Sequence, residues 1–471
     1  MRLRKLSHTL ALIALGLFNQ GCTEGSDITS HCQEPKNLCI DSLSNLSIET
    51  LRQREYGSRI HLKQNLNNSK PNDQRYLASY LSDGLEIYTR VDIPATSMPE
   101  TGYPVLVFAH GWTDTQASAN YDFSYDNNAM YAMLVDTFTN AGFIVLMPGF
   151  RGHGTLAGNQ ADGFDYLTAW NNASYLSPTY YAIDTLNLID SISSLNDINW
   201  QKWHQKIRRK PNVDLSRVYL LAHSQGGDVA LTTLAIAGEG SGVKTTIKAA
   251  SIWAGNIPAR FTQAETFRPM ASSLEAFMSG DGTWTGNAVG KDGSVNPNFI
   301  FPYPSDWIGT IDTQSDKWTW QKEVWQENSI KKIIQSTYQE MYDTLNYYVR
   351  DLEDATFSVT KDSQGQIVIQ HNRDIAKKMA HIGGYEYPKY LSEPIALHYG
   401  EHDYYSMPKW NEILANKITL AGGEAYAFMY PHNNHSLKAS EHEWFSPTGT
   451  EDGQDKAITR DLQLFSDQIP Q

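Results

Sequence analysis

Cysteine, basic residues and long apolar runs are scarce in this 471-residue sequence. Its three cysteines allow at most one disulfide bond within the chain. The 38 Lys and Arg residues are outnumbered by 52 Asp and Glu residues, and a net charge of -14 repels phosphate backbones, so nucleic-acid binding is not expected. With 41% apolar and 19% charged residues, the composition is that of a globular protein rather than of a disordered, collagen-like or coiled-coil chain.

The N-terminal residues have the features of a bacterial export signal. Three basic residues precede the apolar stretch 10–18, which is about half as long as a membrane-spanning helix, so no permanent transmembrane segment is expected. Gly21 and Cys22 then resemble the lipobox in which a cysteine receives lipid, although Asn19 and Gln20 depart from its usual residues. We expect an exported protein of the bacterial cell envelope, held at a membrane through lipid on Cys22. The alternative is a plain secretory signal, which would leave the protein periplasmic or secreted.

The segment after Cys22 is predicted to be a polar tether and lead-in. If Cys22 carries lipid, Cys32 and Cys39 remain as a pair with six residues between them. In an oxidising compartment these two cysteines could close a small loop, and two free thiols are the alternative.

The remaining sequence predicts an α/β fold with a mostly parallel sheet and an antiparallel start. Residues 77–80 and 85–93 flank a Ser-Asp-Gly turn and alternate apolar with polar side chains, which predicts an antiparallel hairpin. Beyond it, apolar runs alternate with helical patterns, as is typical of strands covered on both faces and joined by right-handed crossovers. The runs are 105–109, 143–147, 218–222, 247–254, 395–399 and 426–430, and the helical patterns span 130–138, 410–418 and 458–469.

Residues 256–392 interrupt this alternation and are predicted to form an inserted cap subdomain, because a structureless loop of that length is improbable in a compact domain. They contain a helical pattern from 330 to 348 and two alternating segments, 357–360 and 366–369, that predict a hairpin. Their aromatic side chains either line a substrate pocket or form the core of the cap itself. Five of the chain's twelve tryptophans lie here, namely Trp284, Trp307, Trp318, Trp320 and Trp325.

A candidate nucleophile, Ser224, follows the apolar run 218–222 in the sequence Ala-His-Ser-Gln-Gly. This is the layout of a nucleophile elbow, a strained strand-to-helix turn that exposes a serine hydroxyl above the sheet and demands small neighbours. Ala222 stands where the usual G-x-S-x-G pattern has its first glycine, and Gly226 keeps the second. One oxyanion donor should be the N–H of Gln225, and the other should come from the loop after an early strand.

The general base and its orienting acid are expected later in the chain, in the order Ser, Asp, His. Asp403 follows one predicted strand, and His435 lies in the loop after the next. In this interpretation His435 moves the proton, and Asp403 fixes its tautomer and stabilises the imidazolium. Glu401 is the alternative to Asp403, and His432 is the alternative to His435.

Other chemistries fit the sequence less well. The histidines of this region could be read as a zinc site, but His398 belongs to a predicted strand and His402 lies beyond its end, so they do not share a helix face as in HExxH. No GxxxxGK[ST] phosphate loop occurs. We therefore expect no metal and no other cofactor. A surface binding protein on an inactive hydrolase scaffold would be expected to lack a triad member, whereas all three residue types are present.

Six short motifs occur in one order: Tyr80-Leu-Ser-Asp-Gly-Leu, His110-Gly-Trp, Pro148-Gly-Phe-Arg-Gly-His-Gly, His223-Ser-Gln-Gly-Gly, Gly400-Glu-His-Asp and Tyr430-Pro-x-x-x-His. In these motifs the chain resembles the α/β-hydrolases, specifically the catalytic domain of the prolyl oligopeptidase family of serine peptidases and bacterial dipeptidyl-aminopeptidase-like hydrolases. The resemblance implies an α/β-hydrolase fold with Ser224, Asp403 and His435 as the triad. It also implies that the backbone N–H groups of Trp112 and Gln225 are the oxyanion donors.

The resemblance leaves the substrate open between a small peptide and an ester. Peptidases of that family carry an N-terminal β-propeller, for which the lead-in segment is too short. A carboxylesterase or lipase-type enzyme on the same triad is therefore the alternative to a peptidase. The expected parts are a signal peptide (1–21), a tether and lead-in (22–74), the first part of the hydrolase core (75–255), the cap (256–392) and the second part of the core (393–471).

Overall fold

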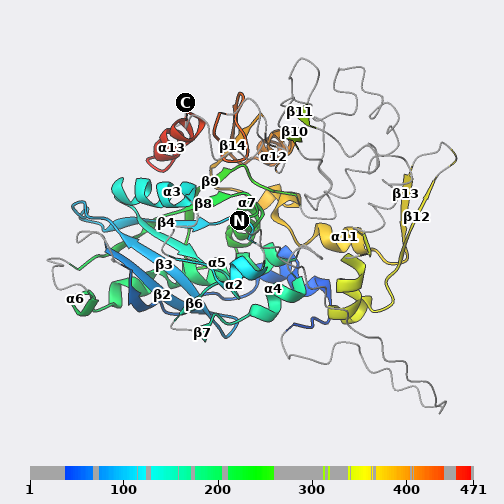
Figure 1. Cartoon of the computed structure of the whole chain (residues 1–471), viewed down its shortest axis with the longest axis horizontal. Coiled ribbons are helices and arrows are strands. Elements are labelled where there is room, and N and C mark those ends of the chain that lie inside the picture. The colour runs from blue at the N-terminus through cyan, green and yellow to red at the C-terminus, as the bar shows by residue number, and fades with distance from the viewer. Residues whose placement is uncertain are drawn as a thin grey trace, which may run out of the picture.

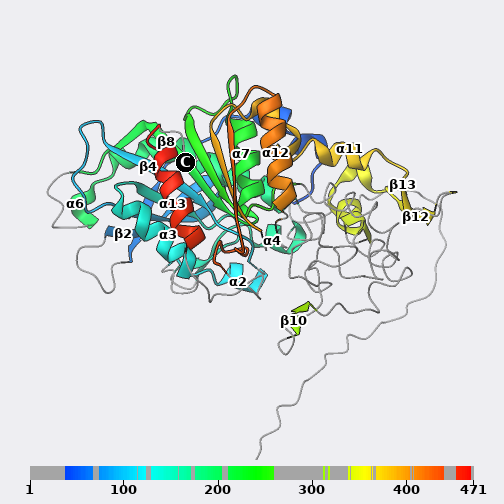
Figure 2. The same ribbon diagram turned by 90° about the horizontal axis from the view of Figure 1, so that it is seen from above.

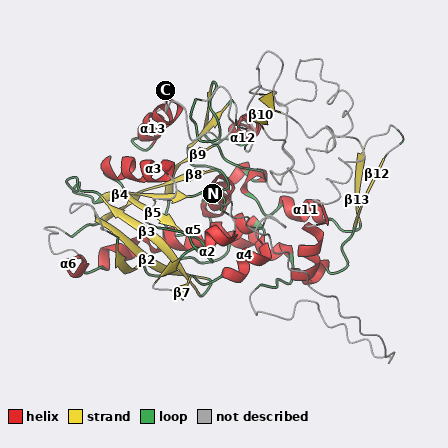
Figure 3. Cartoon of the chain, viewed as in Figure 1, coloured by secondary structure: helices red, strands yellow, loops and turns green. Residues whose placement is uncertain are grey.

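Among the described residues, nine strands form one sheet in the order β1-β2-β3-β5-β4-β8-β9-β14-β15 (Figures 1 and 3). The computed structural model describes residues 38–66, 74–113, 115–123, 129–156, 159–170, 176–203, 210–258, 311–312, 317–318, 338–339, 341–361, 363, 367–401, 403, 406, 408–439 and 452–467. The strands of the sheet are β1 (His61–Asn65), β2 (Gln74–Ser82), β3 (Leu85–Ile93), β4 (Tyr103–Ala109), β5 (Ile144–Pro148), β8 (Val213–His223), β9 (Ile247–Trp253), β14 (Ile395–Gly400) and β15 (Ala425–Tyr430).

The sheet is antiparallel at its start and parallel thereafter. β1 pairs with β2, β2 with β3 and β3 with β5 in antiparallel register, whereas β5, β4, β8, β9, β14 and β15 pair with one another in parallel. The six predicted apolar runs each coincide with one of the parallel strands, and the predicted hairpin is β2 and β3. The predicted fold class is therefore confirmed.

Alternate residues of the central strands face two different layers of helices. In β4, Val105 and Val107 pack in one apolar cluster with helices α5 (Ser177–Ser191), α7 (Gly226–Ala237) and α12 (Pro408–Leu420). Leu106 and Phe108 face the other way, into a cluster with α3 (Ala129–Asn140) and α13 (Asp452–Leu464). Figure 2 shows α3 and α13 together on one side, with α7 and α12 away from them. Because both faces are covered, the strands are apolar throughout rather than alternating.

Shorter elements lie around these layers. The remaining described helices are α1 (Ile48–Arg52), α2 (Thr115–Ala119), α4 (Phe164–Trp170), α6 (Trp200–Trp203) and α11 (Ile375–Ala380), with 3-10 turns at Leu43–Leu46, Ile192–Asp197, Arg350–Leu352, Gly384–Glu386 and Pro388–Tyr390. The short strands are β6 (Thr155–Leu156), β7 (Asn159–Gln160), β10 (Ile311–Asp312), β11 (Lys317–Trp318), β12 (Phe357–Lys361) and β13 (Ile367–His371).

Residues that precede position 75, the boundary expected from the sequence, also pack against the sheet. β1 adds a strand at the edge of the sheet, and Leu43, Ile48 and Leu51 are buried in the main apolar cluster. The buried guanidinium of Arg52 donates to carbonyl oxygens at the end of α7, to that of Ala235 at 2.7 Å and to those of Ile236, Gly238 and Glu239. The residues from Leu43 to Asn65 thus pack with the sheet, since they close the end of α7 and cover one sheet edge.

The described part of the insertion contains the predicted hairpin. β12 and β13 pair in antiparallel register with Val359 opposite Ile369, and Figures 1 and 2 both show this hairpin at the opposite end of the molecule from β2. Tyr338 and Tyr342 are buried in the main apolar cluster, so these two aromatic residues of the insertion serve as core. Of its five tryptophans, Trp318 lies in β11, and the other four lie outside the described residues.

The predicted export signal, Cys22 and Cys32 lie outside the described residues. Within the described ranges, no helix combines the length and the apolar character needed to cross a membrane. Cys39 is disulfide-bonded. Its pairing with Cys32 stays a prediction, because neither of the other cysteines is described.

Candidate active site

Ser224 occupies a strained turn between β8 and α7. Its φ is +57°, in the left-handed region that costs a residue with a β-carbon about 1 kcal/mol or more. The backbone on both sides of this strained residue is fixed by hydrogen bonds. The Ser224 N–H donates to the carbonyl oxygen of Trp253 at 3.1 Å, and the Ser224 carbonyl oxygen accepts from the N–H groups of Gly227 and Asn256, both at 2.8 Å. The structure thus has the strand-turn-helix geometry of a nucleophile elbow at the predicted residue.

Close backbone contacts explain the small residues after Ser224. A β-carbon on Gly226 would lie 2.2 Å from the carbonyl oxygen of Ala109 and 2.8 Å from that of His110. A β-carbon on Gly227 would lie 2.6 Å from the α-carbon of Gly255. Neither position can hold a larger residue without a backbone shift, and the elbow is therefore pressed against the loop that follows β4.

Asp403 and His435 form a buried pair beyond the ends of β14 and β15. His435 Nδ1 lies 3.0 Å from each carboxylate oxygen of Asp403, and the side chains of His435 and Asp403 are 5% and 0% exposed. The N–H of Ser406 also donates to Asp403 Oδ1 at 3.0 Å, which fixes the carboxylate. A carboxylate only accepts, so Nδ1 of His435 carries a proton, and the neutral form of this ring has its lone pair on Nε2. This is the tautomer that a general base for Ser224 requires.

The other two candidates at this sheet edge pair with each other. The His432 side chain is 70% exposed, and its ring Nδ1 lies 3.9 Å from the Glu401 carboxylate. The His432 backbone N–H donates to the same carboxylate at 2.9 Å. The structure therefore places His432 and Glu401 at the surface, and it places Asp403 and His435 together in the interior.

His223 connects Ser224 to the loop of His435. His223 Nε2 lies 3.1 Å from the backbone carbonyl oxygen of His435, and the centroids of the two imidazole rings are 4.9 Å apart. Since His223 directly precedes Ser224, the nucleophile and the proposed base lie at the same edge of the sheet, where parallel strands β8 and β15 end.

The predicted oxyanion donors lie on the two segments that meet at the elbow. A β-carbon on Gly111 would lie 3.0 Å from Ser224 Cβ, so the loop after β4 runs directly beside the nucleophile. The Gly111 N–H donates a hydrogen bond to the Tyr131 hydroxyl oxygen at 2.9 Å. In the part of the chain that the structure describes, the N–H groups of Trp112 and Gln225 make no hydrogen bond. These two donors are thus available to an oxyanion, and the Trp112 side chain is 42% exposed.

His398, from the region of the alternative zinc site, binds protein groups through both ring nitrogens. His398 is fully buried, with Nε2 2.9 Å from Asp461 Oδ1 and Nδ1 2.7 Å from the Tyr430 hydroxyl. Asp461 also accepts from the indole N–H of Trp253 at 2.8 Å, so this group ties α13 to β9, β14 and β15. His402 lies outside the described residues, among which no group of three or more His, Cys, Asp or Glu side chains could hold a metal ion.

Three residues near the site were not predicted from the sequence. Tyr131 and His223 are buried beside the elbow, and burial lowers the pKa of His223 to about 3, with a smaller contribution from His435. Asp228, in the first turn of α7, is also buried, and burial raises its carboxyl pKa to about 8. The sequence shows a histidine, His223, directly before Ser224. No sequence pattern, however, predicts which groups a histidine at the end of a strand will bind.

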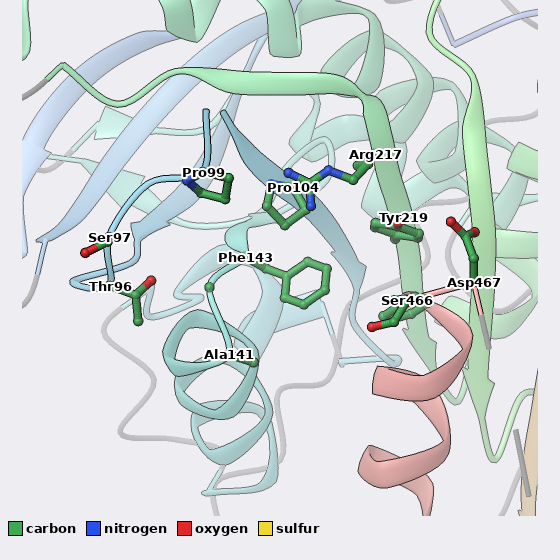
Figure 4. Close-up of a pocket in the computed structure, with 12 residues that line it drawn as sticks. Thr96, Ser97, Pro99, Pro104, Ala141, Phe143, Arg217, Tyr219, Ser466 and Asp467 are labelled. Atoms are coloured by element: carbon green, nitrogen blue, oxygen red, sulfur yellow. The ribbon is translucent and has the colours of Figure 1, made fainter. Parts of the chain in front are cut away.

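A cavity of about 520 Å³ lies at the other edge of the sheet (Figure 4). It is lined by Pro104 and Phe143, at the starts of β4 and β5, and by Arg217, Tyr219 and Asp467. Ser224 follows the opposite, carboxyl end of the parallel strands. A molecule in this cavity therefore cannot reach the nucleophile.

Comparisons with known proteins give matches of low similarity. Dipeptidyl peptidase 4 of Porphyromonas gingivalis is 13% identical with a TM-score of 0.42, and the match covers 84% of this chain but 36% of that one. Acetyl xylan esterase from Paenibacillus sp. R4 is 14% identical with a TM-score of 0.45, and the match covers 91% of this chain and 93% of that one. The acylaminoacyl peptidase of Pyrococcus horikoshii is 13% identical with a TM-score of 0.41, and the match covers 85% of this chain and 42% of that one. No protein-family model and no curated protein sequence matches the chain.

The strand order and the elbow define the class of protein. The chain has the α/β-hydrolase fold, with the serine after a central parallel strand and the Asp-His pair after the last two strands. At this edge of the sheet it brings together a serine, a histidine and an aspartate.

Proposed function

We propose that this protein is an exported serine hydrolase that cleaves a peptide or ester bond through an acyl-enzyme intermediate. The observation that carries the proposal is the buried Asp403–His435 pair, joined through His223 to a serine in the elbow conformation. The Ser224 hydroxyl needs a base with a lone pair on Nε2, and the 3.0 Å contact with Asp403 favours the tautomer of His435 that has its proton on Nδ1.

The chemistry follows from these positions. The Ser224 hydroxyl attacks the acyl carbonyl carbon while His435 Nε2 takes its proton, and the oxyanion is stabilised by the N–H groups of Trp112 and Gln225. The tetrahedral intermediate collapses, and the leaving amine or alcohol receives the proton from His435. Water then attacks the acyl carbon and gives a proton to His435, which returns it to Ser224 as the carboxylic acid leaves. No cofactor is needed for these steps.

Labelling with a fluorophosphonate probe tests the proposal without knowledge of the substrate. We expect the wild type to be labelled and Ser224→Ala and His435→Ala to remain unlabelled. The matched control is His432→Ala, which removes an exposed histidine from the same loop and should label normally. Absence of labelling in every sample would favour a binding protein on a hydrolase scaffold instead.

The leaving group is the next question for a labelled protein. Turnover of p-nitrophenyl esters and of aminoacyl p-nitroanilides should be compared in the wild type, with Ser224→Ala as the background. We expect Ser224→Ala to lower kcat on the better substrate by at least about a thousandfold while the fold stays intact. A preference for anilides would favour a peptidase, and turnover of esters alone would favour a carboxylesterase.

We also propose that lipid on Cys22 anchors the protein in the cell envelope. The support is the order of basic residues, short apolar stretch and Gly21-Cys22 in the sequence. In bacterial cells, Cys22→Ala should move the protein from the membrane fraction to the soluble fraction. An unchanged distribution would overturn the anchor and leave the plain secretory signal.

A further inference from the structure

A buried chain of hydrogen bonds links the oxyanion loop to the loop of His435. The Gly111 N–H lies 2.9 Å from the Tyr131 hydroxyl, and that hydroxyl lies 2.9 Å from Nδ1 of His223. His223 Nε2 in turn lies 3.1 Å from the backbone carbonyl oxygen of His435. Tyr131 is 6% exposed and His223 is 5% exposed, so water does not compete for these bonds.

The direction of each bond can be assigned from its end groups. The carbonyl oxygen of His435 only accepts, so His223 Nε2 carries a proton and donates a hydrogen bond to that oxygen. Burial keeps the pKa of His223 near 3, so its ring is neutral and has a lone pair on Nδ1 at neutral pH. The Tyr131 hydroxyl therefore donates to Nδ1. The Gly111 N–H, which can only donate, donates to the hydroxyl oxygen of Tyr131. All three hydrogen bonds therefore run, donor to acceptor, from the oxyanion loop toward His435.

We propose that Tyr131 and His223 are positioning residues that hold the oxyanion loop, the elbow and the loop of the general base in register. This inference rests on the proposed serine hydrolase function. Four elements meet in the chain: the loop after β4, helix α3, the end of β8 and the loop after β15. None of the three hydrogen bonds involves the reacting groups, so Tyr131 and His223 act through Gly111, Ser224 and His435.

Two features show why this register matters to the reaction. Because the Gly111 N–H is held by Tyr131, the next N–H in the loop, that of Trp112, is the one left for the oxyanion. The His223 ring also lies 4.9 Å from the His435 ring, which becomes positive during the reaction. A neutral His223 avoids a second positive charge beside it, and the hydrogen bond to Tyr131 maintains the neutral tautomer.

The variants separate the two links of the chain. Tyr131→Phe keeps the ring that packs on Phe108 and removes only the hydroxyl. His223→Gln places a side-chain nitrogen where Nε2 lies and can still donate to His435, whereas His223→Asn is too short to reach that oxygen. Tyr76→Phe is the matched control, because the Tyr76 hydroxyl is buried and makes no hydrogen bond within the described structure.

The measurement is the rate of fluorophosphonate labelling as a function of probe concentration, together with the final labelled fraction. We expect Tyr131→Phe and His223→Asn to lower the maximal rate about ten- to a hundredfold, with less than about a twofold change in the half-saturating concentration. His223→Gln, which keeps the bond to His435 but lacks an acceptor for Tyr131, should recover part of the rate lost in His223→Asn, and Tyr76→Phe should match the wild type. The final labelled fraction should stay at that of the wild type.

The outcomes distinguish this inference from the proposed function. An unlabelled wild type would overturn the function, and the inference with it. A labelled wild type with an equal maximal rate in Tyr131→Phe would overturn the positioning role alone. A reduced labelled fraction that reacts at the wild-type rate would show that Tyr131 serves only folding. Equal losses of labelling rate in His223→Gln and His223→Asn would refute the contribution of the hydrogen bond between His223 and His435.

Discussion

Replacement of Asp403 by asparagine removes one negative charge and leaves the shape of the site almost unchanged. In the wild type, Nδ1 of His435 lies 3.0 Å from both carboxylate oxygens. The N–H of Ser406 donates to Oδ1, so in Asp403→Asn the amide oxygen takes that place and the NH2 group replaces Oδ2. The NH2 group would then face Nδ1 and favour the tautomer in which Nε2 carries the proton and cannot act as base.

The expected magnitude follows from the geometry. A unit charge 3.0 Å from the imidazolium, at the effective dielectric constant of about 20 that suits buried protein sites, stabilises the transition state by about 5.5 kcal/mol. This corresponds to about a ten-thousandfold loss of rate. Asp403 is fully buried, so solvent would replace little of the lost stabilisation.

The assay is the maximal rate of fluorophosphonate labelling, with Glu401→Gln as the matched control. Glu401 lies two residues away and contacts the backbone N–H of His432, so its neutralisation should change the rate less than about threefold. A loss smaller than about tenfold in Asp403→Asn would refute the role assigned to this carboxylate. Equal losses of labelling rate in Asp403→Asn and Glu401→Gln would refute the choice of Asp403 over Glu401 as the orienting acid.

Two further substitutions test the packing and the electrostatics of the elbow. Gly226→Ala should lower the free energy of unfolding by more than about 2 kcal/mol and abolish labelling, because its β-carbon would lie 2.2 Å from the Ala109 carbonyl oxygen; a variant with the wild-type urea midpoint and labelling rate would contradict this account. Because burial raises the pKa of Asp228 to about 8, the folded state retains a proton that the unfolded state has lost, so stability should fall as pH rises from about 5 to 8. Asp228→Asn should flatten that fall in urea titrations, and parallel curves for the two proteins would count against it.

The parallel strands could be predicted because each is a run of apolar residues covered on both faces. β1 could not, since its sequence His-Leu-Lys-Gln-Asn buries only Leu62 well and its place depends on pairing with β2. Helix α5 could not be predicted for a different reason. It is buried along nearly its whole length and includes polar residues, whose partners lie far away in the sequence. Asp184 binds Arg151, and Asn187 binds Ser82.

The site could be predicted where one residue type and one position determine the chemistry. A serine after a buried strand, followed by an acid and a histidine after later strands, selects Ser224, Asp403 and His435 as candidates, and the structure pairs the last two. Tyr131 could not be selected, because a tyrosine in an amphipathic helix looks like any other core residue. Its importance depends on two partners, Gly111 and His223, that only the fold brings within 2.9 Å.

Helix α7 is held at both of its ends, and this has a practical consequence for shortened versions of the protein. Gly226 packs its first turn against the loop after β4, and Arg52 binds the carbonyl oxygens at its other end. A protein cut to begin at residue 75 would lose Arg52 and would expose the backbone of β2, which β1 now covers. An exposed strand edge invites pairing between molecules. A truncated protein that aggregates or reacts slowly would therefore report damage to the scaffold and not the absence of a working nucleophile.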